Sequence, residues 1–211
     1  MNIAILIFDK LTALDAVGPY EVLSRLPGAE LEFVAVEPGA KRTDTGALAL
    51  IADRSLTEVA APDVLVIGGG EGSRPLMEDE AVLDWVRGAH AASTWTTSVC
   101  TGSLILGAAG ILDGVRATTH WAWRQRLADL GAEVVADRVV IDGKIVTAAG
   151  VSAGIDMALT LAAEIAGPEV AQAIQLGIEY DPEPPFDSGS PEKAPAAIVG
   201  LVRGLEGGTR D

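Results

Sequence analysis

The 211-residue chain has very little of the two residue types that most often build metal sites and covalent cross-links. It contains a single cysteine, Cys100, and two histidines. One cysteine excludes an internal disulfide and a metal site made of thiolates. Cys100 is therefore either an inert core residue, because free cysteine packs as a small hydrophobe, or a reactive thiol.

Positive charge is also scarce. The chain has 15 Lys and Arg against 30 Asp and Glu, which gives a formal net charge of −15 and an isoelectric point of about 4.4. No basic run interrupts this excess of acid. Because such a surface repels phosphate backbones, we expect no nucleic-acid partner.

Long hydrophobic runs are the third absence. No apolar stretch is long and charge-free enough to span a bilayer, and "MNIAILIFDK" lacks the basic leader of a signal peptide. We therefore expect a cytoplasmic protein with no membrane partner. Hydrophobic residues still make up 49% of the chain, and the mean hydropathy is +0.32. That composition excludes a disordered chain.

Short apolar runs alternate with helical patterns along the chain. Strand-like runs occupy residues 3–8, 30–39, 47–53, 63–70 and 94–99. Helical patterns occupy residues 15–26, 75–92, 101–112, 118–131, 152–167 and 168–180, with a stop at Gly167 and Pro168. Pro19 fits the first turn of the first helix. Asp142 and Gly143 fit a type I′ turn of a hairpin. Alternation with several wholly apolar strands predicts an α/β fold, a mostly parallel sheet with helices on both faces.

This pattern continues without a repeat or a dividing linker. We predict one domain over residues 1–211, with an irregular Pro- and Gly-rich segment at 181–195 and a short C-terminal helix. Ligands of parallel sheets bind beyond the carboxyl ends of the strands. Three chemistry-bearing places follow such ends, namely Asp15, Gly68 to Gly70, and Cys100. We expect them to share one crevice.

The surroundings of Cys100 favour the reactive interpretation. The cysteine stands where a strand becomes a helix, and a helix N-terminus stabilises a thiolate. A strand-to-helix elbow also requires small neighbours, and Ser98 and Gly102 supply them two residues to either side. We predict that Cys100 is a nucleophile on such an elbow.

Two further features have two interpretations each. Asp15 is a lone carboxyl among apolar residues, which makes it either a buried acid with a raised pKa or the N-cap of its helix. The glycines of "GGGEG" (68–72) fail the dinucleotide and phosphate-loop patterns. They form either a plain tight turn or a loop whose backbone approaches a substrate with an N–H donor.

The two histidines are candidates for activating the thiol. His90 lies in the helical pattern over 75–92 and is expected to be solvated. His120 lies twenty positions after Cys100 in "TTHW". It is either brought back to the thiol by an intervening turn or is a half-buried imidazole beside Trp121, and both interpretations stay open.

Five segments together resemble the DJ-1/PfpI superfamily, and within it the isonitrile (isocyanide) hydratase branch. They are "LDAVGPYEVL", "VIGGGEG", "TTSVCTGSLILGAAGILDG", "RATTHWAW" and "AGIDMALTLAAEIAG". The resemblance extends over nearly the whole chain. It implies a flavodoxin-like α/β sandwich that forms a homodimer, with the active site near the subunit interface.

The same resemblance implies roles for four residues. Cys100 would be the nucleophile on the elbow, Asp15 the neighbouring acid, and Thr101 the catalytic residue after the nucleophile. Gly70 and Thr101 would each supply a backbone N–H donor. The implied activity is a cofactor- and metal-independent hydration of a small-molecule isonitrile to an N-substituted formamide through a cysteine thioimidate.

Two other classes of protein remain open. One is another thiol enzyme of the superfamily, glyoxalase- or amidase-like, which would use a base such as His120. The other is a non-enzymatic binding or redox-sensing module, in which Cys100 is oxidised. "SVCTGS" and "TTHW" also occur in regulators with a C-terminal DNA-binding region, for which we expect no room before Asp211.

Overall fold

The computed structural model describes residues 1–207. Contacts divide the chain into two compact units, residues 1–178 and residues 179–211. The first unit holds the sheet and the helices that cover it. The second begins after the last of these helices. That both belong to one domain over residues 1–211 stays a prediction.

The first unit is built around a seven-stranded sheet. Its strands run in the order β10 (Val139–Asp142), β11 (Ile145–Ala148), β7 (Trp95–Val99), β6 (Val64–Ile67), β1 (Asn2–Leu6), β2 (Glu30–Ala35) and β5 (Arg54–Ser55). Every neighbouring pair is parallel except β10 and β11. Strands β6 and β11 are buried throughout, as expected for strands covered on both faces. The predicted mostly parallel sheet is confirmed.

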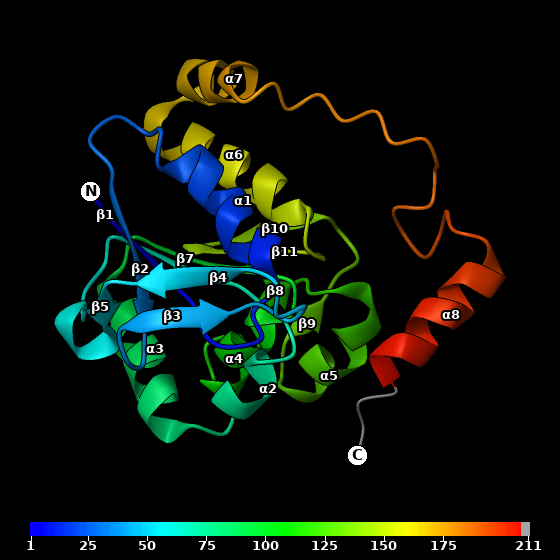
Figure 1. Ribbon diagram of the computed structural model, residues 1–211, viewed down its shortest axis with the longest axis horizontal. Coiled ribbons are helices and arrows are strands. Elements are labelled where there is room, and N and C mark those ends of the chain that lie inside the picture. The colour runs from blue at the N-terminus through cyan, green and yellow to red at the C-terminus, as the bar shows by residue number, and fades with distance from the viewer. Residues whose placement is uncertain (208–211) are drawn as a thin grey trace. The chain divides into compact units, whose positions relative to one another are not determined.

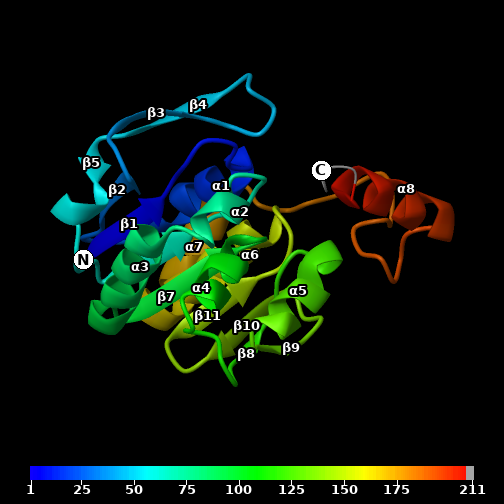
Figure 2. The ribbon, with the colours of Figure 1, turned by 90° about the horizontal axis from the view of Figure 1, so that it is seen from below.

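Helices cover both faces of this sheet (Figures 1 and 2). One layer consists of α1 (Ala13–Leu23), α6 (Ala153–Ala166) and α7 (Pro168–Gly177). The other contains α2 (Ser73–Leu76), α3 (Glu80–Ala92), α4 (Gly102–Ala108) and α5 (Arg124–Asp129). The α/β fold with helices on both faces is therefore confirmed.

Helices α1 and α6 pack closely because small residues line their contact. A Cβ on Gly18 would lie 3.1 Å from the Ile155 side chain, and one on Gly154 would lie 3.4 Å from Pro19. Pro19 lies in the second turn of α1 rather than in the predicted first turn, because the helix already begins at Ala13. It has no N–H to donate to the carbonyl of Asp15.

Two short strand pairs and two 3₁₀ turns complete this unit. Strands β3 (Gly39–Arg42) and β4 (Ala49–Ala52) form a hairpin, β8 (Arg116–Ala117) pairs with β9 (Glu133–Val134), and η1 (Leu56–Glu58) and η2 (Trp121–Trp123) are single 3₁₀ turns. A bridge between Leu11 and Thr43 joins the hairpin to the loop after β1. The hairpin therefore lies against the start of α1.

Three local predictions need correction. The helix predicted over 75–92 is broken, because Asp79 caps α3 by accepting from the N–H groups of Ala81 and Val82. The helix predicted over 118–131 is η2 followed by α5. In the hairpin of β10 and β11, Asp142 pairs with Ile145. Gly143, with a φ of +58°, is therefore the first of the two loop residues, whereas the predicted type I′ turn made it the second. A glycine at the first position suits a type II′ turn.

The second unit contains the irregular segment and a helix. Residues 181–195 form no helix or strand, and α8 spans Ala196–Gly207. Across residues 1–207, none of the helices combines the length and the apolar character needed to cross a membrane.

Candidate active site

Cys100 lies on a tight elbow between β7 and α4. Its φ is +57°, in the left-handed region that non-glycine residues rarely adopt. The backbone around it is fully bonded: the Cys100 N–H donates to the carbonyls of Ala148 and Ala149, at 3.2 and 2.9 Å. Its carbonyl accepts from the hydroxyls of Ser103 and Thr119, at 3.1 and 2.9 Å. The predicted elbow is present, and these bonds hold its strained conformation.

The glycines around the elbow allow backbone to pack directly on backbone. A Cβ on Gly102 would lie 2.1 Å from the Ile67 carbonyl oxygen, and one on Gly69 would lie 2.5 Å from the Thr101 nitrogen. Such distances leave no room for any side chain. The glycine-rich loop after β6 therefore approaches the elbow of its own chain, as expected for two segments that follow strands of one parallel sheet.

Asp15 is fully buried beside the elbow. It lies in the first turn of α1, whose N-cap position is Thr12, so the N-cap interpretation of Asp15 is wrong. Its Oδ2 accepts a 2.8 Å hydrogen bond from the Gly69 N–H, and its carboxyl hydrogen-bonds the side chain of Cys100. The structure thus brings together the thiol, the carboxyl and the glycine loop.

Burial raises the pKa of Asp15 from its ordinary value of 3.8 to about 7. The Gly69 N–H and the Cys100 side chain pull this pKa down, whereas the negative charge of Asp44 pushes it up. The second oxygen, Oδ1, is buried and accepts from no N–H or O–H group of residues 1–207, so desolvation is the largest effect. The carboxyl can therefore hold or release a proton near neutral pH.

Thr101 and Gly70 are in contact with each other. The Gly70 N–H donates to the Thr101 hydroxyl at 2.9 Å, and Ser73 donates to the Gly70 carbonyl at 2.7 Å. The Ser73 and Thr101 hydroxyl oxygens are 3.1 Å apart. The Gly70 N–H is thus bonded within the protein, and its role as a donor to a substrate stays a prediction. Ser73 is buried and belongs to this hydrogen-bond network, which the sequence did not indicate.

The two histidines differ from each other. His120 is half-buried, its Nδ1 accepts from the Ala122 N–H at 3.4 Å, and its ring lies beside Trp121 at 5.6 Å between centroids. These contacts match the second interpretation of His120. His90 is not simply solvated, since its Nδ1 lies 2.9 Å from the Thr96 hydroxyl. Burial, followed by the charge of Lys144, lowers the pKa of His90.

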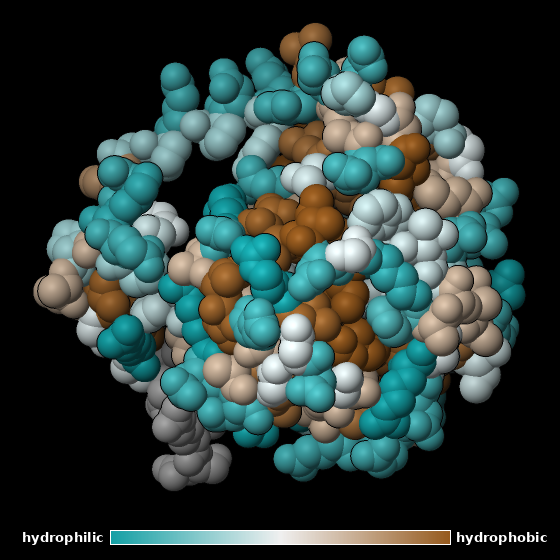
Figure 3. Space-filling model, turned by 180° about the vertical axis from the view of Figure 1, so that it is seen from behind, coloured by the Kyte–Doolittle hydropathy of each residue, from teal (hydrophilic) through white to brown (hydrophobic). Residues whose placement is uncertain are grey.

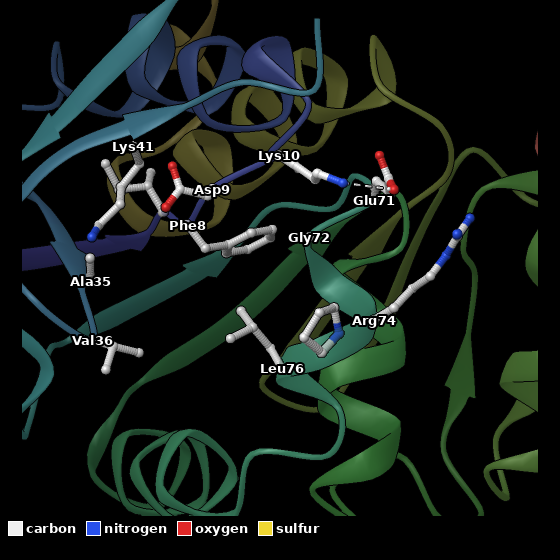
Figure 4. Close-up of a pocket in the computed structure, with 12 residues that line it drawn as sticks. Phe8, Asp9, Lys10, Ala35, Val36, Lys41, Glu71, Gly72, Arg74 and Leu76 are labelled. Atoms are coloured by element: carbon white, nitrogen blue, oxygen red, sulfur yellow. Dashed lines mark hydrogen bonds and ion pairs between the residues drawn. The ribbon is translucent and has the colours of Figure 1, made fainter. Parts of the chain in front are cut away.

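A separate pocket of about 540 Å³ opens at the carboxyl ends of β1 and β2. Its walls include Phe8, Val36 and Leu76, and the Lys10–Glu71 ion pair, 3.0 Å long, lies on one side (Figure 4). None of the predicted catalytic residues lines it. Within residues 1–207, no group of three or more His, Cys, Asp or Glu is arranged to hold a metal ion.

Comparison with known proteins places this arrangement in a family. Residues 1–164 match the DJ-1/PfpI family. The chain belongs to the DJ-1/PfpI family. Isonitrile hydratase from Pseudomonas putida is 48% identical over 203 residues, which are 96% of this chain and 89% of that protein.

Solved structures of the DJ-1/PfpI family share the fold. A ThiJ/PfpI family protein from Pseudomonas syringae superposes with a TM-score of 0.94 at 38% identity, over 98% of this chain and 86% of that one. DJ-1beta from Drosophila melanogaster superposes with a TM-score of 0.78 at 24% identity, over 86% of this chain and 98% of that one. The second likeness concerns the fold alone.

Proposed function

We propose that this protein is an isonitrile hydratase, which converts R–N≡C and water to an N-substituted formamide. The observation that carries this proposal is the 48% identity, over nearly the full length of both chains, to the isonitrile hydratase of Pseudomonas putida. The site supports it chemically, because a thiol at an elbow shares a hydrogen bond with a carboxyl whose pKa is about 7. We assign the nucleophile to Cys100 and the acid to Asp15.

The first half-reaction uses both groups at one atom. The terminal carbon of an isonitrile accepts a nucleophile and a proton at the same position. The Cys100 thiolate forms a bond to this carbon while the Asp15 carboxyl delivers its proton there. The products are a thioimidate, Cys100–S–CH=N–R, and the carboxylate of Asp15.

The second half-reaction consumes water. The Asp15 carboxylate takes one proton from water as the oxygen bonds to the thioimidate carbon, which restores the acid. The hydroxyl proton moves to nitrogen, the C–S bond breaks, and the thiolate leaves with the formamide formed. The Thr101 and Gly70 N–H groups would orient the reacting groups. The Gly70 N–H would have to release the Thr101 hydroxyl, to which it now donates, before it could donate to the reactants.

The experiment is incubation with simple aliphatic and aromatic isonitriles, with formamide measured by chromatography. Wild type should turn over, Cys100→Ser should fall to the uncatalysed rate, and Asp15→Asn should lose roughly 10²- to 10⁴-fold in kcat. His120→Ala is the matched control and should retain activity. A protein that needs His120 but tolerates Asp15→Asn would instead be a glyoxalase- or amidase-like enzyme. Absence of turnover on every isonitrile contradicts the proposal.

We further propose that the protein is a cytoplasmic homodimer. Large apolar side chains are exposed on α1 and on the β3–β4 hairpin, namely Leu14, Tyr20, Leu48 and Ile51, and Figure 3 shows hydrophobic residues gathered in the middle of one face. The face in Figure 3 is the one turned away from the viewer in Figure 1, so its hydrophobic residues are a second apolar surface, apart from the β3–β4 hairpin. Apolar surfaces of this kind favour association, and a free thiol suits a reducing compartment. Light scattering should give twice the mass of one chain, and a monomeric mass contradicts the proposal.

A further inference from the structure

Asp44 is an exposed carboxylate on the β3–β4 hairpin, outside the proposed catalytic residues. Its N–H donates to the Leu11 carbonyl at 3.0 Å. Its Oδ2 accepts a 2.7 Å hydrogen bond from the Thr12 hydroxyl, and its Oδ1 accepts from the Thr45 N–H at 2.8 Å. The Leu11 and Thr12 bonds therefore fix Asp44 against the loop that leads into α1, and the Thr45 bond orients its carboxylate.

Thr12 connects Asp44 to the site. It occupies the N-cap position of α1, yet its side chain makes no capping bond, because its hydroxyl donates to Asp44. Its carbonyl accepts the Asp15 N–H at 3.0 Å, and its own N–H donates to the Gly69 carbonyl at 3.0 Å. Gly69 in turn donates to the Asp15 carboxyl. Asp44 thus holds Thr12, which is hydrogen-bonded both to Asp15 and to Gly69.

The charge of Asp44 opposes the local effects that favour an ionised Asp15. A carboxyl in the first turn of a helix is stabilised as the anion by the helix N-terminus. The Gly69 N–H and the Cys100 side chain act in the same direction. Among the described residues, the titratable side chains that act on the Asp15 carboxyl are Cys100, from the elbow, and Asp44, from the hairpin. Helix α6 brings the uncharged Gly154 and Ile155 to its contact with α1.

We propose that Asp44 is a positioning residue, whose carboxylate fixes Thr12 at the start of α1 and so holds the Asp15–Gly69 contact in place, while its negative charge adds to the effect of burial on Asp15. This inference rests on the proposed hydration reaction, although its effect on Asp15 does not depend on any substrate. Asp44 does not touch the reacting atoms and acts only through Thr12 and through its charge.

Asp44→Asn tests the charge, because asparagine keeps the size and the acceptor for Thr12. The first readout is kcat/KM for isonitrile hydration against pH. The second is the rate at which iodoacetamide alkylates the protein, measured against pH. Iodoacetamide is uncharged, and it reports on Cys100 because the chain has one thiol. Removing the charge should move both profiles to lower pH by roughly 0.2 to 0.7 pH units, the size of an exposed charge interaction. This shift should shrink at 1 M salt.

Two control variants separate charge from structure. Asp53→Asn removes an exposed carboxylate after β4 and should leave both profiles unchanged. Thr12→Val removes the hydrogen bond to Asp44 but keeps the charge of Asp44. It should therefore lower the melting temperature or kcat, and it should move the two pH profiles less than Asp44→Asn does. Thermal unfolding of each variant shows whether it is folded.

Each outcome bears on one proposal. Profiles of Asp44→Asn that superimpose on wild type at low salt overturn the role of Asp44, as does a shift that persists at 1 M salt. If wild type hydrates no isonitrile, the proposed function fails, but the alkylation profiles still support or overturn the effect of Asp44 on the thiol–carboxyl pair. If hydration is normal and neither profile moves, only the inference about Asp44 fails.

Discussion

Two carboxyl groups near the carboxyl ends of the strands, Asp15 and Glu71, lie in opposite electrostatic environments. At the elbow, Asp15 is fully buried, has a hydrogen bond to only one N–H and has a pKa of about 7. At the rim of the pocket, Glu71 is paired with Lys10 at 3.0 Å, and both side chains are largely exposed. A carboxyl changes its chemistry when it loses water without gaining a cation, whereas an exposed pair gains little.

The largest expected effect of this difference is on stability against pH. Because the pKa of folded Asp15 is about 7 and its ordinary value is 3.8, the folded protein holds a proton that the unfolded chain releases between these values. The contribution of Asp15 to the free energy of unfolding is therefore complete below pH 4 and is lost as the pH rises to 7. The loss is on the order of 4 kcal/mol.

Asp15→Asn removes this dependence, since asparagine does not titrate. Chemical unfolding at pH 4 and at pH 8 should show the variant gaining stability relative to wild type at the higher pH. Glu71→Gln, which removes an exposed carboxyl nearby, should change by less than about 1 kcal/mol at both values. Parallel stability curves for wild type and Asp15→Asn would mean that burial does not perturb the acid.

The second effect concerns the close packing of the elbow against the end of β6. Gly102→Ala would place a Cβ 2.1 Å from the Ile67 carbonyl oxygen, and a strand backbone cannot move aside without disturbing β6. We expect a loss of roughly 2 to 4 kcal/mol in the free energy of unfolding, together with lower hydration activity, because α4 must shift with Cys100. Denaturant unfolding and the formamide assay measure both.

Gly88→Ala is the matched control for this change. Gly88 is exposed in α3, and nothing lies within 4 Å of a Cβ built there. Because alanine is the better helix former, we expect a gain of up to about 1 kcal/mol. If both alanine variants are equally stable, the close approach of Gly102 to the end of β6 is not required for folding.

The sequence sufficed for those parts of the site that are determined locally. Apolar runs predicted the strands, and the small residues beside Cys100 predicted the elbow. The choice between cap and acid for Asp15 depends on Thr12 taking the cap position and on Gly69, 54 positions away, donating to the carboxyl. The first relation has a local signal, because Thr12 followed by Asp15 three residues later is a typical helix start. The second has none.

Other contacts were beyond reach for the same reason. Asp44 meets Thr12 across 32 positions, and Ser73 meets Thr101 across 28; both contacts depend on how loops from separate strands converge. The break at Asp79 is different, because an aspartate before an apolar run is a known start signal. There the amphipathic pattern over 75–92 concealed the end of one helix and the start of another.

The smallest expected effect tests whether the two places are independent. Glu71 is next to Gly70 in the glycine loop, yet its carboxyl bonds Lys10 in solvent rather than any residue of the elbow. Glu71→Gln should therefore change stability by less than about 1 kcal/mol and leave kcat/KM and its pH profile within error of wild type. A loss of activity comparable to that of Asp15→Asn would show that the exposed pair and the buried carboxyl act on one site. The contrast between them would then be one of solvation within a single active centre.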